Sequence, residues 1–496
     1  MRHHRLSARL TALLVPLALA GTTLFVAPAA QADPADARAK NSLTGPRDAA
    51  PGERFTLRGS QRFGKVKLRL ERRTGGKWKK VAQKKKSGKK FSFATAAPTN
   101  ASGALKYRVR AVVKKKKRTV AKTSVKVVKQ RLTLSSPTAP RTAQSTRFAG
   151  TLVPVRPTRP VRVEVHLDGA WKPVGTAGRP SGTGALAATV DTEGYPAWYR
   201  VTAAAWNGIP AVSTAPVLAT LSGPAPTAIA HRAGASLAPE QTLAALERTV
   251  ADGVPSMEID VQLTKDGVPV IVHDKWWDRT TDVETVFPEL TNLADREIAD
   301  LTLAQVKQLD AGSWFGAEFT GERIPTLEEW LVALDGRSHL VLEVKDTEVP
   351  GNANIRAVLD GMLTAGPLRD LADAGKLTVS SFGNPYVPPL LGGGDFLKEF
   401  AESYPEIPVG VLHFGSLSVA QIAEASAWAD EMHSKYDFVD RAFTDRVRAA
   451  RTPPMSTSVW TADTLAQHRA AIATGAERVI SDHPENLALA LNPPRP

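Results

Sequence analysis

Short apolar runs alternate with stretches of helical periodicity from Thr227 to the end of the chain. The predicted strands are Ala228–His231, Ser256–Leu263, Val268–His273, His339–Val344, Leu377–Ser381, Val409–His413, Ser456–Trp460 and Arg478–Ser481. The predicted helices are Gln241–Ala251, Leu303–Leu309, Thr326–Leu334, Asn354–Ala365, Val419–Ala427 and Thr464–Thr474. Because strands that alternate with helices form a parallel sheet covered by those helices, we predict an α/β TIM-type (β/α)8 barrel over residues 223–496.

Before residue 222 the pattern changes to short alternating strands separated by glycine-rich turns, and it occurs twice. The matching positions of the two copies are Val66–Leu70 with Val161–Val165, Trp78 with Trp171, and Tyr107 with Tyr199. This repeat predicts two Ig-like β-sandwich modules, residues 33–130 and 131–222. We expect the repeated tryptophan and tyrosine to pack in the core of each module.

The first 32 residues have the pattern of an export signal. Arginines precede an apolar stretch from Leu10 to Val26, and Ala30-Gln31-Ala32 offers a cleavage site between small residues. We therefore expect residues 1–32 to be a cleaved signal peptide and the mature chain to be secreted, with association with the cell wall as a further expectation. Retention as a membrane anchor is the alternative. No later apolar stretch has the length that spans a bilayer, so we expect no transmembrane segment in the mature chain.

The net charge of +15 is divided unevenly along the chain. Residues 33–130 carry 30 lysines and arginines against 5 acidic residues, whereas residues 223–496 carry 22 against 40. We expect residues 65–130 to bind an extracellular polyanion, such as a wall polymer or an anionic lipid surface. The alternative is a solvated face that aids solubility. Few aromatic residues are interleaved with the lysines, so sequence-specific nucleic-acid recognition is not expected.

Polar residues lie at or near the ends of the predicted barrel strands. They are His231, Arg232, Glu258, Asp260, His273, Glu343 and Lys345. Side chains alternate along a strand, so Glu258 and Asp260 share one face. In a parallel barrel such a face can open at the C-terminal ends of the strands, where the reactions of these barrels take place.

These residue types form a chemically coherent set. The three carboxylates are hard oxygen ligands that suit Ca²⁺ or Mg²⁺, and the absence of cysteine excludes thiolate sites. The two histidines can share general-base and general-acid roles near neutral pH. Arg232 offers a planar, always-charged fork for a phosphoryl group, and Lys345 adds positive charge where a transition state would become negative.

Several motifs that contain these residues resemble those of the glycerophosphodiester phosphodiesterase family. In chain order the motifs are His231–Ala235, Ala238–Thr242, Glu258–Gly267, His273-Asp274, Asp278–Thr281, Leu309–Phe315, Arg323–Glu329, Glu343–Lys345, Val459–Thr461 and Ser481–Pro484. The resemblance runs from about residue 228 to 488, more than half of the chain.

The resemblance implies a TIM barrel that uses a divalent metal, Ca²⁺ or Mg²⁺, to cleave glycerophosphodiesters to glycerol 3-phosphate and an alcohol. It implies that His231 and His273 are the acid/base pair. It assigns the metal ligands Glu258, Asp260 and Glu343, and the substrate-binding residues Arg232, Lys345, Glu240 and Trp460. The chain departs from the family pattern at two positions, because Ala233 replaces a usual glycine and Gln241 a usual asparagine.

Two other functions stay open at this point. One is a related barrel phosphodiesterase that acts on intact phospholipids or on wall teichoic acids. The other is a non-enzymatic protein that binds a polyanion or the cell wall; it predicts damage to the set of histidines and carboxylates, which the sequence retains intact. The sequence leaves open the leaving-group alcohol, the native metal and the oligomeric state. It also leaves open which histidine is the base.

Overall fold

The computed structural model describes residues 40–134, 142–178, 180–345, 354–382 and 394–496. The expected signal peptide, residues 1–32, lies outside these described residues. Contacts divide the chain into two compact units, one made mainly of residues 55–95 and 104–125 and the other mainly of residues 126–496. None of the described helices is both long and apolar enough to cross a membrane.

The described part of the C-terminal half contains a closed ring of eight parallel strands. The strands, in ring order, are β17 (Thr227–Ala230), β25 (Arg478–Ser481), β24 (Ser456–Trp460), β23 (Glu431–Lys435), β22 (Val409–His413), β21 (Leu377–Ser381), β20 (His339–Val344) and β18 (Ser256–Leu263). Parallel pairing of β18 with β17 closes the ring. The predicted TIM-type barrel is therefore confirmed.

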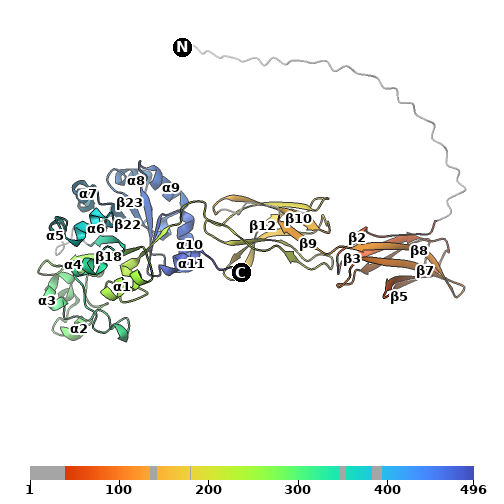
Figure 1. The fold of residues 1–496 in the computed structure, drawn as a ribbon, viewed down its shortest axis with the longest axis horizontal. Coiled ribbons are helices and arrows are strands. Elements are labelled where there is room, and N and C mark those ends of the chain that lie inside the picture. The colour runs from red at the N-terminus through yellow and green to blue at the C-terminus, as the bar shows by residue number, and fades with distance from the viewer. Residues whose placement is uncertain (1–39, 135–141, 179, 346–353, 383–393) are drawn as a thin grey trace, which may run out of the picture. The chain divides into compact units, whose positions relative to one another are not determined.

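Helices surround this ring, as Figure 1 shows. They are α1 (Leu243–Ala251), α4 (Leu327–Leu334), α5 (Ile355–Met362), α6 (Pro367–Asp373), α7 (Gly394–Ser403), α8 (Val419–Ala425), α9 (Arg441–Ala449), α10 (Leu465–Thr474) and α11 (Glu485–Leu491). Side chains just before the first turn cap several of them, for example Thr242, Thr326, Ser418 and Thr464. The apolar faces of α1 and of α4 to α9 pack on the outward side chains of the strands and form the main core, whereas α10 and α11 pack in a second cluster against β24 and β25.

The ring differs from the prediction at one strand. The predicted strand Val268–His273 is β19 (Pro269–Ile271), which pairs antiparallel with β18 and lies outside the ring. The eighth strand of the ring is instead β23 (Glu431–Lys435), which the sequence pattern did not predict. The sequence Glu-Met-His-Ser-Lys looks polar, but its first four residues are buried because the interior of the barrel is itself polar here.

A buried ionic layer fills the barrel at the N-terminal ends of the strands. The Arg478 guanidinium donates to Glu431 Oε1 over 2.5 Å, and His433 Nε2 lies 3.0 Å from Glu431 Oε2. Burial alone would raise the pKa of Glu431, but its bond to His433 and the charge of Arg478 lower it to about 2. A Cβ on Gly410 would lie 2.5 Å from the His433 ring, so this layer also requires a glycine on β22.

A smaller apolar core lies between β19 and α4. Trp277, Val283, Ile298 and Leu309 are among its buried residues, and it includes the short helices α2 (Val283–Val286) and α3 (Leu303–Val306). The predicted helix at 303–309 is therefore present but shorter. This small core supports the loop that carries His273.

The N-terminal half consists of two copies of the same strand arrangement. In the first copy the sheets are β1 (Ser42–Thr44), β3 (Arg54–Ser60), β6 (Lys90–Ala96), and β2 (Asp48–Ala49), β8 (Lys116–Val127), β7 (Ala104–Val113), β4 (Val66–Thr74), β5 (Lys77–Ser87). In the second copy they are β13 (Ala185–Asp191), β10 (Ser145–Val153), β9 (Arg131–Leu134), and β12 (Ala170–Ala177), β11 (Val161–Leu167), β14 (Trp198–Ala203), β15 (Val212–Ser213), with β16 (Val217–Leu218) beside β14. Each copy therefore contains two β-sheets, and the order of the strands in them is similar in the two copies.

The repeated aromatic residues have two different environments. Tyr107 and Tyr199 are fully buried, as expected for core residues. The prediction is wrong for Trp78 and Trp171, which are only half-buried. Each ring lies under an arginine guanidinium on the outer face of its sheet, at 4.4 Å and 4.1 Å from the ring centroid.

We predict that His339 makes the stability of the barrel depend on pH. Burial and the charge of Arg478 lower the pKa of His339 to about 4. The folded barrel therefore favours the neutral ring, and the resulting stability is complete above pH 6.5 and is lost as the pH falls toward 4. The loss should reach about 2 kcal/mol at pH 5. The variant His339→Gln should show a smaller fall in melting temperature between pH 7 and pH 5, whereas His483→Gln, at an exposed position, should behave as the wild type. Equal falls in all three proteins would contradict this assignment.

Candidate active site

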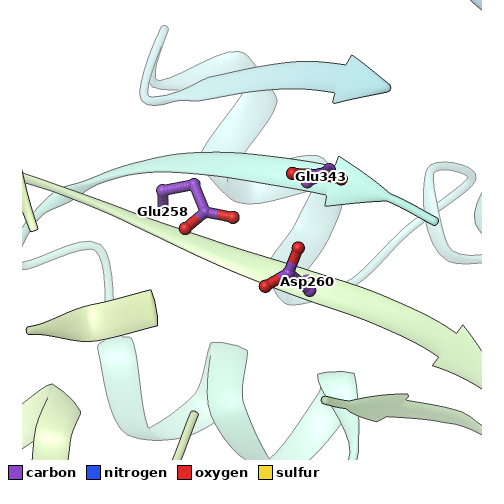
Figure 2. Close-up of side chains that lie close together, drawn as sticks. All are labelled: Glu258, Asp260 and Glu343. Carbon is purple, nitrogen blue, oxygen red and sulfur yellow. The ribbon is translucent and has the colours of Figure 1, made fainter. Parts of the chain in front are cut away.

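Three buried carboxylates lie together at the C-terminal ends of two neighbouring strands. Glu258 and Asp260 belong to β18, and Glu343 belongs to β20, directly opposite Asp260 in the register of the two strands. Figure 2 shows these side chains on their two strands. One oxygen of each carboxylate lies within 4.8 Å of the others. The alternation of β18 and the parallel pairing with β20 thus bring together the three residues expected to bind metal.

The carboxylates repel one another, and one lysine offsets part of that repulsion. Lys345 Nζ lies 2.7 Å from Glu343 Oε1 and 3.1 Å from Asp260 Oδ1. Burial would raise the pKa of Asp260, but Lys345, His273 and other nearby cations lower it to about 2. Burial and the neighbouring carboxylates raise the pKa of Glu258 well above its usual value. Burial likewise raises that of Glu343, to about 7.

This set of donors fits a divalent cation. Glu258 Oε1 is buried and has no hydrogen-bond partner among the described residues. An unpartnered carboxylate oxygen in a buried, mutually repelling group is costly unless further positive charge is present. Three carboxylate oxygens at this spacing are the ligands that Ca²⁺ and Mg²⁺ prefer.

Each of the two expected acid/base histidines has its own carboxylate partner. His231 Nδ1 lies 2.6 Å from Asp482 Oδ1, and His273 Nδ1 lies 2.7 Å from Asp274 Oδ1. A carboxylate at Nδ1 favours the proton there and leaves Nε2 free to exchange a proton with a ligand. His231 Nε2 is 4.0 Å from Glu258 Oε2, so this ring adjoins the acidic group. The sequence analysis assigned no role to either aspartate.

A chain of ion pairs next to the pocket holds the Arg232 side chain in place. The Arg232 guanidinium donates to Glu240 over 2.9 Å. Arg279 bonds both oxygens of Glu240, and it also bonds Asp274, the partner of His273. Glu240 was predicted to bind substrate; it is 7% exposed, is not among the residues that line the pocket, and holds two arginines in place. Arg279 is a further contributor that sequence reasoning missed.

The backbone between β17 and α1 is left-handed at Arg232, Ala233 and Gln241, where φ is +49°, +62° and +64°. Residues with a side chain rarely adopt this conformation, which glycine and asparagine tolerate better. Ala233 and Gln241 are the two positions where the chain departs from the family pattern, and they keep the left-handed backbone. Gln241 Nε2 also donates to Asp260 Oδ2 over 2.5 Å, so its longer amide fixes one of the carboxylates.

One pocket joins these groups, and the empty space in and in front of it is about 560 Å³, part of which is open solvent. The expected site residues that line it are His231, Arg232, Glu258, His273, Glu343, Lys345 and Trp460. Asp260 lies beneath, fully buried. The wall away from the charges is aromatic: Phe382 and Phe414 stack at 4.8 Å, and Trp460 meets both edge-on. The two phenylalanines follow β21 and β22, and no sequence motif indicated them.

Comparison with known proteins identifies the family of the barrel. The model of the Glycerophosphoryl diester phosphodiesterase family matches residues 231–486, which include every residue of this site. The chain belongs to this family. The two β-rich copies before residue 222 lie outside the match.

Relatives named as phosphodiesterases match about half of the chain or less. The glycerophosphodiester phosphodiesterase of Caldanaerobacter subterraneus is 30% identical over 266 residues, which cover 52% of this chain and 95% of that protein. Glycerophosphodiester phosphodiesterase 1 of Mus musculus is 43% identical over 105 residues, 21% of this chain and 28% of that protein. A solved phosphodiesterase of Oleispira antarctica, in complex with the product sn-glycerol-3-phosphate, is 26% identical, covers 54% of this chain and 97% of its own, and has a TM-score of 0.44.

We predict that Ala233→Gly stabilises the barrel, because glycine removes the cost of a left-handed backbone at a Cβ-bearing residue. The gain in the free energy of unfolding should be about 1 kcal/mol. Ala230→Gly is the matched control, since Ala230 is also buried but has a φ of −73°. It should lose about 0.5–1 kcal/mol. Thermal unfolding of both variants checks the prediction, and a loss of stability in both would show that packing of the Ala233 side chain outweighs its backbone strain.

Proposed function

We propose that the barrel hydrolyses glycerophosphodiesters to glycerol 3-phosphate and an alcohol in a metal-dependent reaction. One observation carries this proposal: two histidines, each held at Nδ1 by an aspartate, share a pocket with a buried group of three carboxylates. Family membership supports the substrate class, because the relative from Caldanaerobacter is named a glycerophosphodiester phosphodiesterase.

The residues of the pocket divide the work in this proposal. Arg232 and Lys345 supply positive charge for the phosphate oxygens. Nε2 of one histidine takes the proton of the attacking hydroxyl, from water or from the glycerol 2-OH, and Nε2 of the other gives a proton to the leaving oxygen. Glu258, Asp260 and Glu343 would hold Ca²⁺ or Mg²⁺, which would polarise a non-bridging phosphate oxygen. The half-buried aromatic wall with Trp460 excludes water from one side of the phosphate.

We further propose that the chain works outside the cell. The apolar segment 10–26 and the Ala-x-Ala site support a cleaved signal peptide, secretion and association with the cell wall. The two pairs of sheets before residue 222 are proposed to be Ig-like sandwiches. The excess of lysine and arginine in residues 65–130 supports binding of an extracellular polyanion.

Product analysis tests the proposed activity and its need for metal. We expect the purified chain to release glycerol 3-phosphate from glycerophosphocholine, glycerophosphoethanolamine and glycerophosphoinositol, as measured by mass spectrometry of the products. EDTA should abolish the release, and Ca²⁺ or Mg²⁺ added in excess should restore it. Release of phosphocholine or diacylglycerol from phosphatidylcholine, without cleavage of glycerophosphocholine, would instead support the intact-phospholipid alternative.

Each pocket histidine should be required for turnover. We expect His231→Ala and His273→Ala each to lower kcat on glycerophosphocholine by 10²–10⁴, because a positioned proton donor or acceptor contributes about that factor. Both variants should keep the melting temperature of the wild type to within a few degrees. His483→Ala is the matched control: this histidine is exposed and bonds Glu485, and it should retain full activity. Wild-type kcat in either pocket variant would refute the acid/base role of that histidine.

A further inference from the structure

The outer face of the sheet β8-β7-β4-β5 is organised around one buried glutamate. Glu71 accepts from Arg108 over 2.7 Å and pairs with Arg69 at 3.2 Å. The Arg108 guanidinium also covers the Trp78 ring. In this Glu–Arg–Arg–Trp centre, the two arginines neutralise Glu71, which is the one acidic residue in β4, β5 and β7.

The second copy contains the same centre. Glu164 accepts from Arg162 over 2.6 Å and from Arg200 over 2.7 Å, and the Arg200 guanidinium covers the Trp171 ring. The strand registers agree, since Glu71 lies opposite Arg108 and Glu164 opposite Arg200. The Glu–Arg–Arg–Trp centre is therefore common to the two copies. The strand registers also show which residues around the centre occupy the same position in each copy.

The positions around the centre differ in charge between the copies. The first copy has four lysines or arginines around the centre, and the second has neither residue at the aligned positions. The aligned pairs are Arg73 with His166, Lys80 with Pro173, Lys106 with Trp198, and Arg110 with Thr202. Because the second copy forms the same strand arrangement without these cations, the fold does not require them.

These four cations form what we call the basic face, and they point away from the core. Arg73, Lys80 and Lys106 are exposed, and Arg110 is half-buried with one bond to the backbone carbonyl of Lys117. The buried residues Leu70 and Val109 alternate with them on the other side of the sheet. Lys106 and Arg110 are four residues apart on β7, which is about 14 Å, and the neighbouring strands that carry Arg73 and Lys80 are each about 4.8 Å apart, so the face is an open array of positive charge.

The side chains on and around the basic face favour one class of polyanion over two others. An anionic bilayer is disfavoured, because none of the large hydrophobic side chains that are exposed in the described residues falls within residues 40–134. Nucleic acid is disfavoured, because Trp78, the one tryptophan near the face, has its ring covered by Arg108 and cannot stack on a base. Arginine forks and lysines in an open array suit the regularly spaced phosphates of a linear polymer.

We propose that the basic face binds a flexible, linear phosphate polymer without bases. This inference rests on the proposed polyanion partner of residues 65–130 and narrows it to one face and one chemical class. The opposite charge of the C-terminal half suggests what the basic face contributes. Residues 223–496 carry 40 acidic residues against 22 basic ones, so the barrel has no general attraction for an anionic polymer, and a tethered basic face supplies it.

A salt titration of the full chain with fluorescent long-chain inorganic polyphosphate tests the proposal. Affinity measured by anisotropy should fall with salt, and the slope of log K against log salt reports the number of phosphates that are contacted. The variant Arg73→His/Lys80→Gln/Lys106→Gln/Arg110→Thr should lower the magnitude of that slope by about 3. The double variant Lys80→Gln/Lys106→Gln changes exposed side chains alone and should lower it by about 1. Its unfolding should match the wild type.

A matched control removes the same charge away from the face. The variant Arg58→Gln/Arg62→Gln/Lys89→Gln/Lys90→Gln neutralises four exposed cations on or beside β3 and β6, which belong to the other sheet, and should change the slope by less than about 1. If this control lowered the slope as much as the variant of the basic face, the assignment of binding to that face would be wrong, because net charge alone would then explain the binding. Tighter binding of phosphatidylglycerol vesicles or of single-stranded DNA, at equal phosphate concentration and salt, would overturn the ligand class.

The outcome is separable from the proposed activity. Polyphosphate binding needs no turnover, and the four face residues lie outside the pocket, so cleavage of glycerophosphocholine should be unchanged in every face variant. A wild-type chain that binds none of the three polyanions but cleaves glycerophosphocholine would refute the polyanion partner and leave the hydrolase intact. Binding of polyphosphate without cleavage of glycerophosphocholine would refute the proposed hydrolase and leave the polyanion partner intact.

Discussion

The mutual repulsion of three carboxylates buried within 4.8 Å of one another is the constraint on which the site depends. Bringing negative charges into a buried region is costly, and each nearby feature of the structure lowers that cost. Lys345 supplies a cation from the end of β20. The left-handed turn after β17 aims the Arg232 backbone N–H at Glu258 over 2.9 Å. Gln241 adds an amide donor to Asp260. What remains unbalanced is the charge that a divalent cation would neutralise.

The barrel concentrates polar side chains inside both of its ends, for different reasons. At the N-terminal ends of the strands, the buried Glu431 carboxylate is bonded by His433 and by Arg478, so its negative charge is compensated. At the C-terminal ends, Glu258 Oε1 is left without a partner in the described residues, and a pocket opens beside it. The balance of charge therefore distinguishes the two ends: one carboxylate has two cationic or hydrogen-bonding partners at the N-terminal end, whereas three carboxylates lie together beside the pocket at the C-terminal end.

Much of the barrel and its site could be predicted from the sequence because both depend on local patterns. Apolar runs predicted seven strands of the ring, and polar residues at their ends predicted the carboxylates and histidines that the structure brings together. The strand β23 was missed because its burial depends on Arg478, 47 residues from Glu431. Asp482 was missed as a partner because it lies 251 residues from His231. Trp78 and Trp171 were assigned to the core because the sequence does not show which side of a sheet an arginine will cover.

The division of charge between the two halves limits how the N-terminal half can assist the barrel. Electrostatic fields of exposed charges are screened over about 8 Å in physiological salt, so the residues that line the pocket dominate the potential inside it. In the proposed reaction the positive charge for the phosphate comes from Arg232, Lys345 and a cation that the three carboxylates would hold. A basic module can act instead by raising the local concentration of a polymer to which the whole chain is tethered. In this proposal the pocket recognises a single phosphodiester, and the basic module captures the polymer. Capture of the polymer then depends on the salt concentration, whereas the chemical step does not.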